Sequence, residues 1–145
     1  ARRCMSAPPD PRRSAAPSTG PTASPGVTLD LDTEKQNALF DVARSAWAEA
    51  GKPAPHLATS FWFAIGDGDG PRAQVTRHLH HYMNWIPSEF VDAIAPTTGW
   101  AGTEAELADV LRRFADIGTD EVQLIPTSSD LDQLRRAADV VAAFA

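Results

Sequence analysis

The sequence of 145 residues contains a single cysteine, Cys4, no long apolar run, and fewer basic than acidic side chains. One cysteine excludes an internal disulfide and a cysteine-based zinc site, which favours a reducing compartment. No stretch approaches the roughly 20 apolar residues that span a bilayer, and the arginine-containing start lacks the apolar middle of a signal peptide. A net charge of −6 opposes binding to a phosphate backbone. We therefore expect a cytoplasmic protein that binds neither membrane nor nucleic acid.

The composition changes near residue 30. Residues 1–29 hold six of the twelve prolines and four arginines against one acidic residue, Asp10, with very few large apolar side chains. Such a stretch cannot offset the entropy of ordering, so it predicts a disordered tail. A targeting address or an out-of-frame reading of the gene are the alternatives for this tail. Residues 30–145, in contrast, have the apolar content of one folded domain.

Apolar periodicity and capping signals give the expected elements of that domain. In order, they are a helix over 33–50, a buried strand over 56–65, a helix over 73–85, a short helix over 87–95, a helix from Thr103 to Gly118, a strand over 121–125 and a last helix. The apolar residues that share one helical face are Leu39, Val42, Ala43, Ala46 and Trp47 in the first helix and Leu131, Leu134, Ala138 and Val141 in the last. Alternation of helices and strands predicts an α/β domain with parallel strands, and two strands are too few to cover these helices.

Most motifs that carry chemistry are absent or incomplete. Asp67-Gly68-Asp69 starts like a calcium loop but lacks the later ligands of that motif. His78 and His81 are spaced to share a zinc ion, yet no third ligand has a diagnostic spacing, so we predict no metal site and keep zinc as a minor alternative. No nucleophile elbow, phosphate loop or dinucleotide fingerprint is present. The catalytic residues are therefore unknown at this level.

Three segments together resemble the carboxy-terminal part of the luciferase-like flavin-dependent monooxygenase family. They are AWAEAGKPAPHLATSFWFAIGD, RHLHHYMNWIP and FADIGTDEVQLIPTSSDLDQLRRAADVV, and the resemblance covers residues 37–144. It implies a (β/α)₈ TIM barrel of which this chain supplies the last two strands and their helices. It also implies an oxidoreductase that uses flavin mononucleotide (FMN) or the deazaflavin F420 with oxygen or a small organic substrate. The family's glycine-rich phosphate segment is not found here, so we expect an incomplete chain that is inactive alone.

In barrels of this type the chemistry lies at the carboxyl ends of the strands. By resemblance, the candidate positions are the Gly66-Asp67 region after the first strand and Pro126, Thr127 and Ser128 after the second. Thr127 and Ser128 begin a helix, where hydroxyls and backbone N–H groups could meet a phosphate or a polar flavin edge. Ordinary helix capping explains the same two residues.

A non-enzymatic alternative also fits the sequence. A small α/β module with too few strands has open edges, which tend to recruit another chain. The aromatic residues Trp85 and Trp100 flank proline-rich turns and are candidates for a pocket wall or a subunit contact. This hypothesis predicts a binding partner, including a possible homo-oligomer, in place of a reaction.

Overall fold

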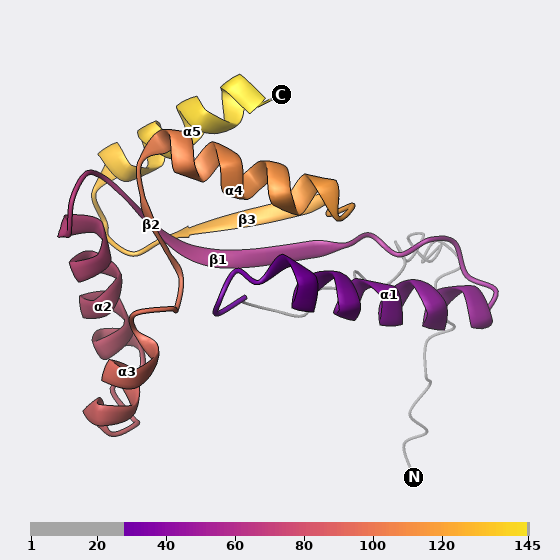
Figure 1. Ribbon diagram of the computed structural model, residues 1–145, viewed down its shortest axis with the longest axis horizontal. Coiled ribbons are helices and arrows are strands. Elements are labelled where there is room, and N and C mark those ends of the chain that lie inside the picture. The colour runs from indigo at the N-terminus through magenta and orange to yellow at the C-terminus, as the bar shows by residue number, and fades with distance from the viewer. Residues whose placement is uncertain (1–27, 145) are drawn as a thin grey trace, which may run out of the picture.

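The computed structural model describes residues 28–144, which form five helices and three strands (Figure 1). The predicted tail over 1–29 lies outside the described residues except for Thr28 and Leu29. The elements, in chain order, are α1 (Thr33–Glu49), β1 (Ala58–Ile65), α2 (Gly70–Tyr82), α3 (Ser88–Ile94), β2 (Trp100–Gly102), α4 (Glu104–Asp116), β3 (Glu121–Pro126) and α5 (Leu131–Phe144). The predicted α/β class is thus confirmed.

The three strands form a parallel sheet in the order β2-β1-β3. β1 is central, and its Phe63 pairs with Trp100 of β2 on one side and with Pro126 of β3 on the other. The short β2 was not predicted. β2 pairs only with the last three residues of β1. Earlier on β1, the backbone N–H of Thr28 donates to Ser60 O at 2.7 Å, so the start of the described chain also hydrogen-bonds to this strand.

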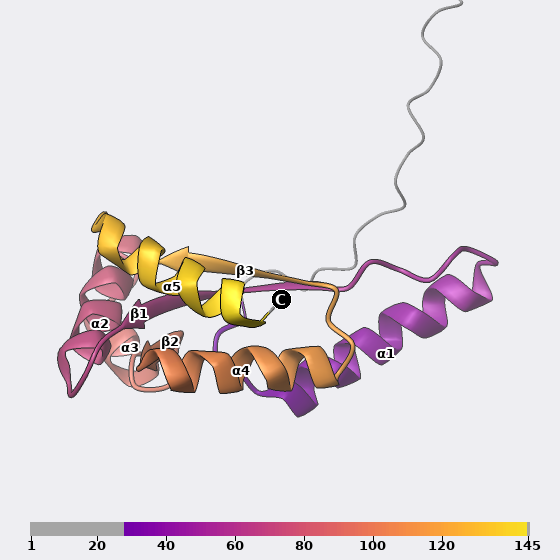
Figure 2. The ribbon, with the colours of Figure 1, turned by 90° about the horizontal axis from the view of Figure 1, so that it is seen from above.

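The direction of chain travel places helices on both faces of this sheet. The chain moves from β1 to β2 in one lateral direction and then returns past β1 to β3. Because parallel crossovers are right-handed, this reversal puts α2 and α3 on one face and α4 and α5 on the other. Figure 1 shows these two layers, and Figure 2 shows α4 and α5 side by side along the strands, with α1 extending beyond the start of β1.

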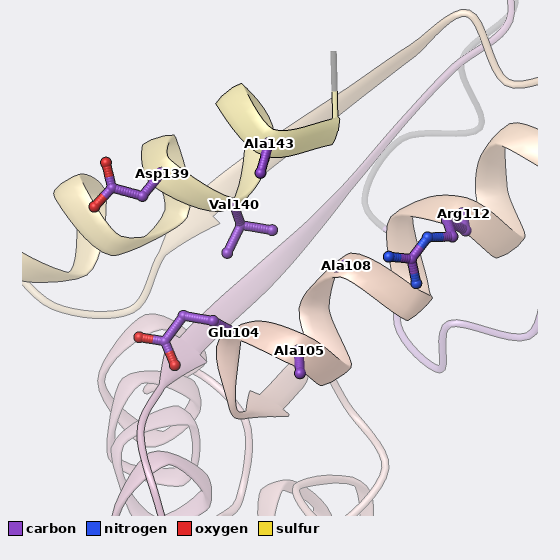
Figure 3. Close-up of a pocket in the computed structure, with 7 residues that line it drawn as sticks. All are labelled: Glu104, Ala105, Ala108, Arg112, Asp139, Val140 and Ala143. Atoms are coloured by element: carbon purple, nitrogen blue, oxygen red, sulfur yellow. The ribbon is translucent and has the colours of Figure 1, made fainter.

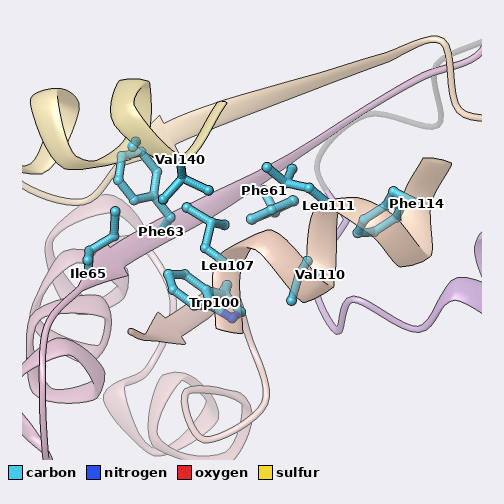
Figure 4. Packing of buried hydrophobic residues seen from close by; sticks show 10 residues of the cluster. Phe61, Phe63, Ile65, Trp100, Leu107, Val110, Leu111, Phe114 and Val140 are labelled. Carbon is cyan, nitrogen blue, oxygen red and sulfur yellow. The ribbon is translucent and has the colours of Figure 1, made fainter. Parts of the chain in front are cut away.

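β1 is buried along its whole length and supplies alternate side chains to two cores. Phe61, Phe63 and Ile65 point into the α4–α5 core (Figure 4), while Trp62 and Ala64 point into the α2–α3 core. The other buried members of the α4–α5 core are Trp100, Leu107, Val110, Leu111, Phe114, Ala137 and Val140. Those of the α2–α3 core are Val75, Leu79, Val91 and Ala95.

Helix α4 follows its sequence signals closely. Thr103 Oγ1 accepts from the backbone N–H of Glu106, whose carboxylate accepts from the backbone N–H of Thr103, which is the predicted capping box. The helix ends before Gly118, whose φ of +78° is the left-handed conformation that glycine adopts without strain. The apolar stripe of this helix is buried, as expected.

The predicted apolar faces of the first and last helices are mostly left uncovered. Helix α1 buries Gln36 and Phe40, whereas Leu39 and Val42 are 53% and 68% exposed. Helix α5 packs through Gln133, Ala137 and Val140. Its predicted stripe of Leu131, Leu134, Ala138 and Val141 is exposed. The periodicity identified the apolar faces of α1 and α5 correctly, but no other element of the described chain packs over these two faces.

Candidate functional site

The two predicted site segments lie at the ends of adjacent parallel strands. β1 ends just before Gly66-Asp67, and β3 ends just before Thr127-Ser128. The loop after β1 leads to α2 on one face, whereas the loop after β3 leads to α5 on the other. Neighbouring strands whose connections leave to opposite faces form a topological switch point, where open α/β sheets usually bind ligands. The fold therefore brings these segments to one place.

Thr127 is buried and its hydroxyl is fully engaged with its neighbours. Oγ1 donates to Phe63 O at 2.8 Å and accepts from Gln74 Nε2 at 2.9 Å, while the backbone N–H of Thr127 also donates to Phe63 O. Ser128 is half-buried, and its Oγ accepts a hydrogen bond from the backbone N–H of Asp130 at 3.3 Å. Ser128 is thus the more accessible of the two hydroxyls.

Helix α5 is fastened to the end of β1 by two side chains that the sequence interpretation missed. Gln133 is buried, accepts from the backbone N–H of Ile65 at 2.7 Å and donates to Ile65 O at 2.9 Å. Arg136 Nη1 also donates to Ile65 O, at 3.2 Å. In the sequence, Arg136 stands four residues after Asp132, a helical spacing typical of a solvated ion pair. Its Nε instead donates to Glu104 Oε1 at 2.6 Å, across the interface between α5 and α4.

The charges around this strand end are mutually coupled. The hydrogen bond from Arg136 is the main cause that holds the pKa of Glu104 below its ordinary value. The same bond raises the pKa of Arg136, with smaller contributions from the negative charges of Asp132 and Asp67. The strand end is therefore rich in carboxylates, and its guanidinium is already paired.

The described residues contain no group of three or more histidine, cysteine, aspartate or glutamate side chains placed to hold a metal ion. Within the histidine cluster, His80 Nε2 lies 2.9 Å from Asp92 Oδ1 on α3, while His78 packs against the rings of Trp62 and Tyr82. His81 is exposed. The imidazoles of this helix are thus directed to different neighbours, which does not support the zinc alternative.

A cavity of about 480 Å³ lies between α4 and α5 (Figure 3). Its lining residues are Glu104, Ala105, Ala108, Arg112, Asp139, Val140 and Ala143. Small alanine side chains leave this space open, and no nucleophile lines it. Neither Thr127 nor Ser128 reaches it. We favour the switch point as the candidate site, because it combines strand ends, a glycine turn and polar side chains from both faces.

No protein-family model matches the chain, and no curated protein matches it. Within residues 28–144, no helix has the length and apolar content that crossing a membrane requires.

The hydroxyl of Thr127 is expected to act mainly on stability. Thr127→Val keeps the side-chain shape but removes both hydroxyl hydrogen bonds, so the free energy of unfolding should fall by about 1–2 kcal/mol. Thr127→Ser should restore most of this loss, and Ser128→Ala should change it by less than about 0.5 kcal/mol. Urea denaturation monitored by circular dichroism measures all three. A Thr127→Val protein as stable as the wild type would contradict this role.

The Glu104–Arg136 pair should be visible in a carboxyl titration. Arg136→Gln removes the bond that lowers the pKa of Glu104, so this pKa should rise towards its ordinary value of 4.5. Because the folded-state pKa is depressed, the pair stabilises the protein above pH 4.5 and loses this effect as the pH falls through the folded-state pKa. Carbon-13 NMR of the glutamate carboxyls measures the change. The matched control, Arg135→Gln, alters an exposed neighbour and should leave the pKa of Glu104 in place.

Proposed function

We propose that this chain is the carboxy-terminal part of a luciferase-like, flavin-dependent oxidoreductase that uses FMN or the deazaflavin F420. In this proposal β1 and β3 are the last two strands of a (β/α)₈ barrel. Three separate sequence segments support it by resemblance, and the direct parallel pairing of β1 with β3 is the pairing that consecutive barrel strands have. In such a barrel β2, on the other edge of β1, and α2–α3, on the face opposite α4–α5, would be an insertion between the two barrel strands. The reaction class would be a monooxygenation or another oxidoreduction of a small organic substrate.

The single observation that carries the proposal is an uncovered apolar layer beside an open strand edge. Leu131, Leu134 and Val141 of α5 are 61%, 45% and 46% exposed. Within the described residues, β3 pairs with β1 alone, so its other edge has no strand. Burying one leucine or valine side chain is worth about 1.5–3 kcal/mol, so a further strand and helix at this edge would be strongly favoured. A longer barrel would supply both.

The residues present do not by themselves fit a flavin phosphate. Carboxylates of Asp67, Asp130 and Asp132 lie on the two loops and the start of α5, and Arg136 is committed to Glu104. A dianionic phosphate would therefore meet negative charge without a free cation. Thr127 and Ser128 are proposed instead as contacts for a neutral polar edge of the flavin ring, with Ser128 the more accessible. We derive no catalytic step from this chain.

A flavin titration compares this chain with its extended form. The chain alone should show no saturable quenching of FMN or F420 fluorescence at micromolar concentration. Sequencing the gene upstream of Ala1 should reveal coding sequence for further strands and a glycine-rich phosphate-binding segment. The longer polypeptide that includes them should bind FMN or F420. In that longer protein Ser128→Ala should weaken binding, with the Ser129→Ala protein as the neighbouring control. A stop codon and promoter directly upstream would contradict the proposal.

The second candidate function is a non-enzymatic module that binds another chain through its open strand edge. The same exposed side chains of α5 favour it, because they lie on the helix that follows the edge strand β3. Light scattering distinguishes the two candidates. If the module is correct, the purified chain forms a defined oligomer that Leu134→Asp converts to a monomer, and no upstream coding text is found.

A further inference from the structure

The second half of α2 is attached to the sheet by a stack of rings around His78. The imidazole lies with its centroid 5.5 Å from the ring of Trp62 on β1 and stacks on Tyr82 at 5.8 Å, with an angle of 17° between the planes. Tyr82 in turn meets Trp62 edge-on at 5.2 Å and Trp85 at 5.8 Å. Trp62 is only 5% exposed beneath this stack. The rings thus seal one side of the α2–α3 core.

His78 has no hydrogen-bond partner for Nε2, although that atom is buried. A neutral imidazole tolerates this position, because it has only one N–H group to place. Protonation would leave a charged N–H donor at this buried atom without an acceptor, which is unfavourable. Cation–π attraction to the neighbouring rings offsets part of that cost. Burial, followed by the charge of His81, lowers the pKa of His78 below 6.5, so the cost is the larger effect.

Among residues 28–144, no carboxylate near the stack is available to compensate the new charge. On α3, Asp92 is engaged by His80, and Glu89 lies on the exposed first turn. On β3, strand alternation puts Glu121 on this face of the sheet with Gln123 and Ile125, and Glu121 bonds both His56 and Gln123. β1 contributes Trp62 together with the uncharged Ser60 and Ala64. His81 on α2 itself adds repulsion.

The first half of α2 is held by different contacts. Arg72 donates to the carbonyl oxygens of Ala95, Thr98 and Gly99 at 2.8–3.3 Å. These bonds do not involve a group that titrates near neutral pH. Movement caused by His78 would therefore be confined to the later turns of α2 and the segment that follows them.

We propose that protonation of His78 releases the second half of α2 from β1 and uncovers the indole of Trp62, which makes this corner of the molecule a pH-sensitive switch. Because the folded state favours neutral His78, stability is greatest above pH 6.5 and declines as the pH falls from there through the folded-state pKa. The proposal does not depend on flavin chemistry. It requires only the packing of α2 on the sheet.

NMR of the whole chain tests this switch between pH 8 and pH 5. The indole N–H signal of Trp62, assigned with the Trp62→Phe protein, should shift together with the His78 ring signal at a midpoint below 6.5. His78→Phe keeps a stacked ring but cannot be protonated, so the Trp62 signal should stay constant. His81→Gln is the matched control, and its transition should remain with a higher midpoint because one positive charge is gone. A transition of Trp62 that persists in His78→Phe, or titration of His78 without any change at Trp62, would overturn the proposal.

Discussion

Replacing Phe114 with alanine is expected to lower the free energy of unfolding by about 3–5 kcal/mol. Phe114 is 0% exposed on α4 and stacks on Phe61 of β1 with centroids 5.9 Å apart. Its removal opens a cavity between the helix and the central strand. Alanine is the best helix former, so the loss would report packing and not helix propensity. A small domain is stable by only about 5–15 kcal/mol, so much of its stability would disappear.

The matched control for this change is Phe90→Ala. Phe90 also lies in a helix, but it is 62% exposed, so its replacement should change stability by no more than about 0.5 kcal/mol. Urea denaturation of both proteins, followed by far-ultraviolet circular dichroism, gives the comparison. Equal losses for the two proteins would mean that the α4–α5 core is not packed as described.

Replacing Gln133 with leucine should destabilise the protein by about 2–3 kcal/mol, although the change makes the buried side chain more apolar. The reason is the backbone of Ile65, whose N–H donates to Gln133 Oε1. The pairing of β1 with β3 ends at Phe63, so no β3 residue lies opposite Ile65 to replace the glutamine. Arg136 would still donate a hydrogen bond to Ile65 O in this variant. The N–H group would be left buried and unpaired.

Amide hydrogen exchange separates this effect from a general loss of packing. In Gln133→Leu the amide of Ile65 should lose protection far more than that of Phe61, which lies earlier on the same strand. Gln123→Ala removes an exposed glutamine from β3 and should leave both amides unchanged. If Ile65 remained protected in Gln133→Leu, water or another group would have to satisfy its N–H.

The sequence allowed much of the fold to be predicted, where the signals were local. The capping box of Thr103 and Glu106 and the buried stripe of α4 depend on residues within a few turns of one another. β1 is recognisable because eight buried residues in a row include three aromatic rings. The three-residue β2 was missed, since so short a strand exists only through its pairing with Phe63, Ala64 and Ile65.

The apolar stripe of α5 shows a different limit. Leu131, Leu134 and Val141 have helical spacing, which predicts one apolar face, yet that face is exposed and Gln133 is buried instead. Periodicity shows which face of a helix is apolar but not whether the chain contains a layer to cover it. In the sequence, a glutamine whose side chain bonds the backbone at the end of a strand cannot be distinguished from a glutamine that faces solvent.

For the candidate site, the parallel arrangement was enough to expect Gly66-Asp67 and Thr127-Ser128 at one end of the sheet. The engagement of the Thr127 hydroxyl was not predictable, because its partners Phe63 and Gln74 are more than fifty residues away in sequence. Long-range hydrogen bonds of this kind decide whether a hydroxyl is available to a ligand. Local motifs carry no information about them.

The central position of β1 also has a consequence for synthesis on the ribosome. Ala58 of β1 pairs with Glu121 of β3, so about 63 further residues must be synthesised after Ala58 before β3, the strand with which β1 forms most of its pairs, begins to exist. At elongation rates of about 5–20 residues per second, this interval lasts roughly 3–12 s. During that time this eight-residue segment, which is rich in aromatic side chains, can pair with the three-residue β2 but lacks β3 and α5. Nascent chains of this protein should therefore depend on chaperones, and synonymous codon changes between residues 66 and 120 should alter the yield of folded protein.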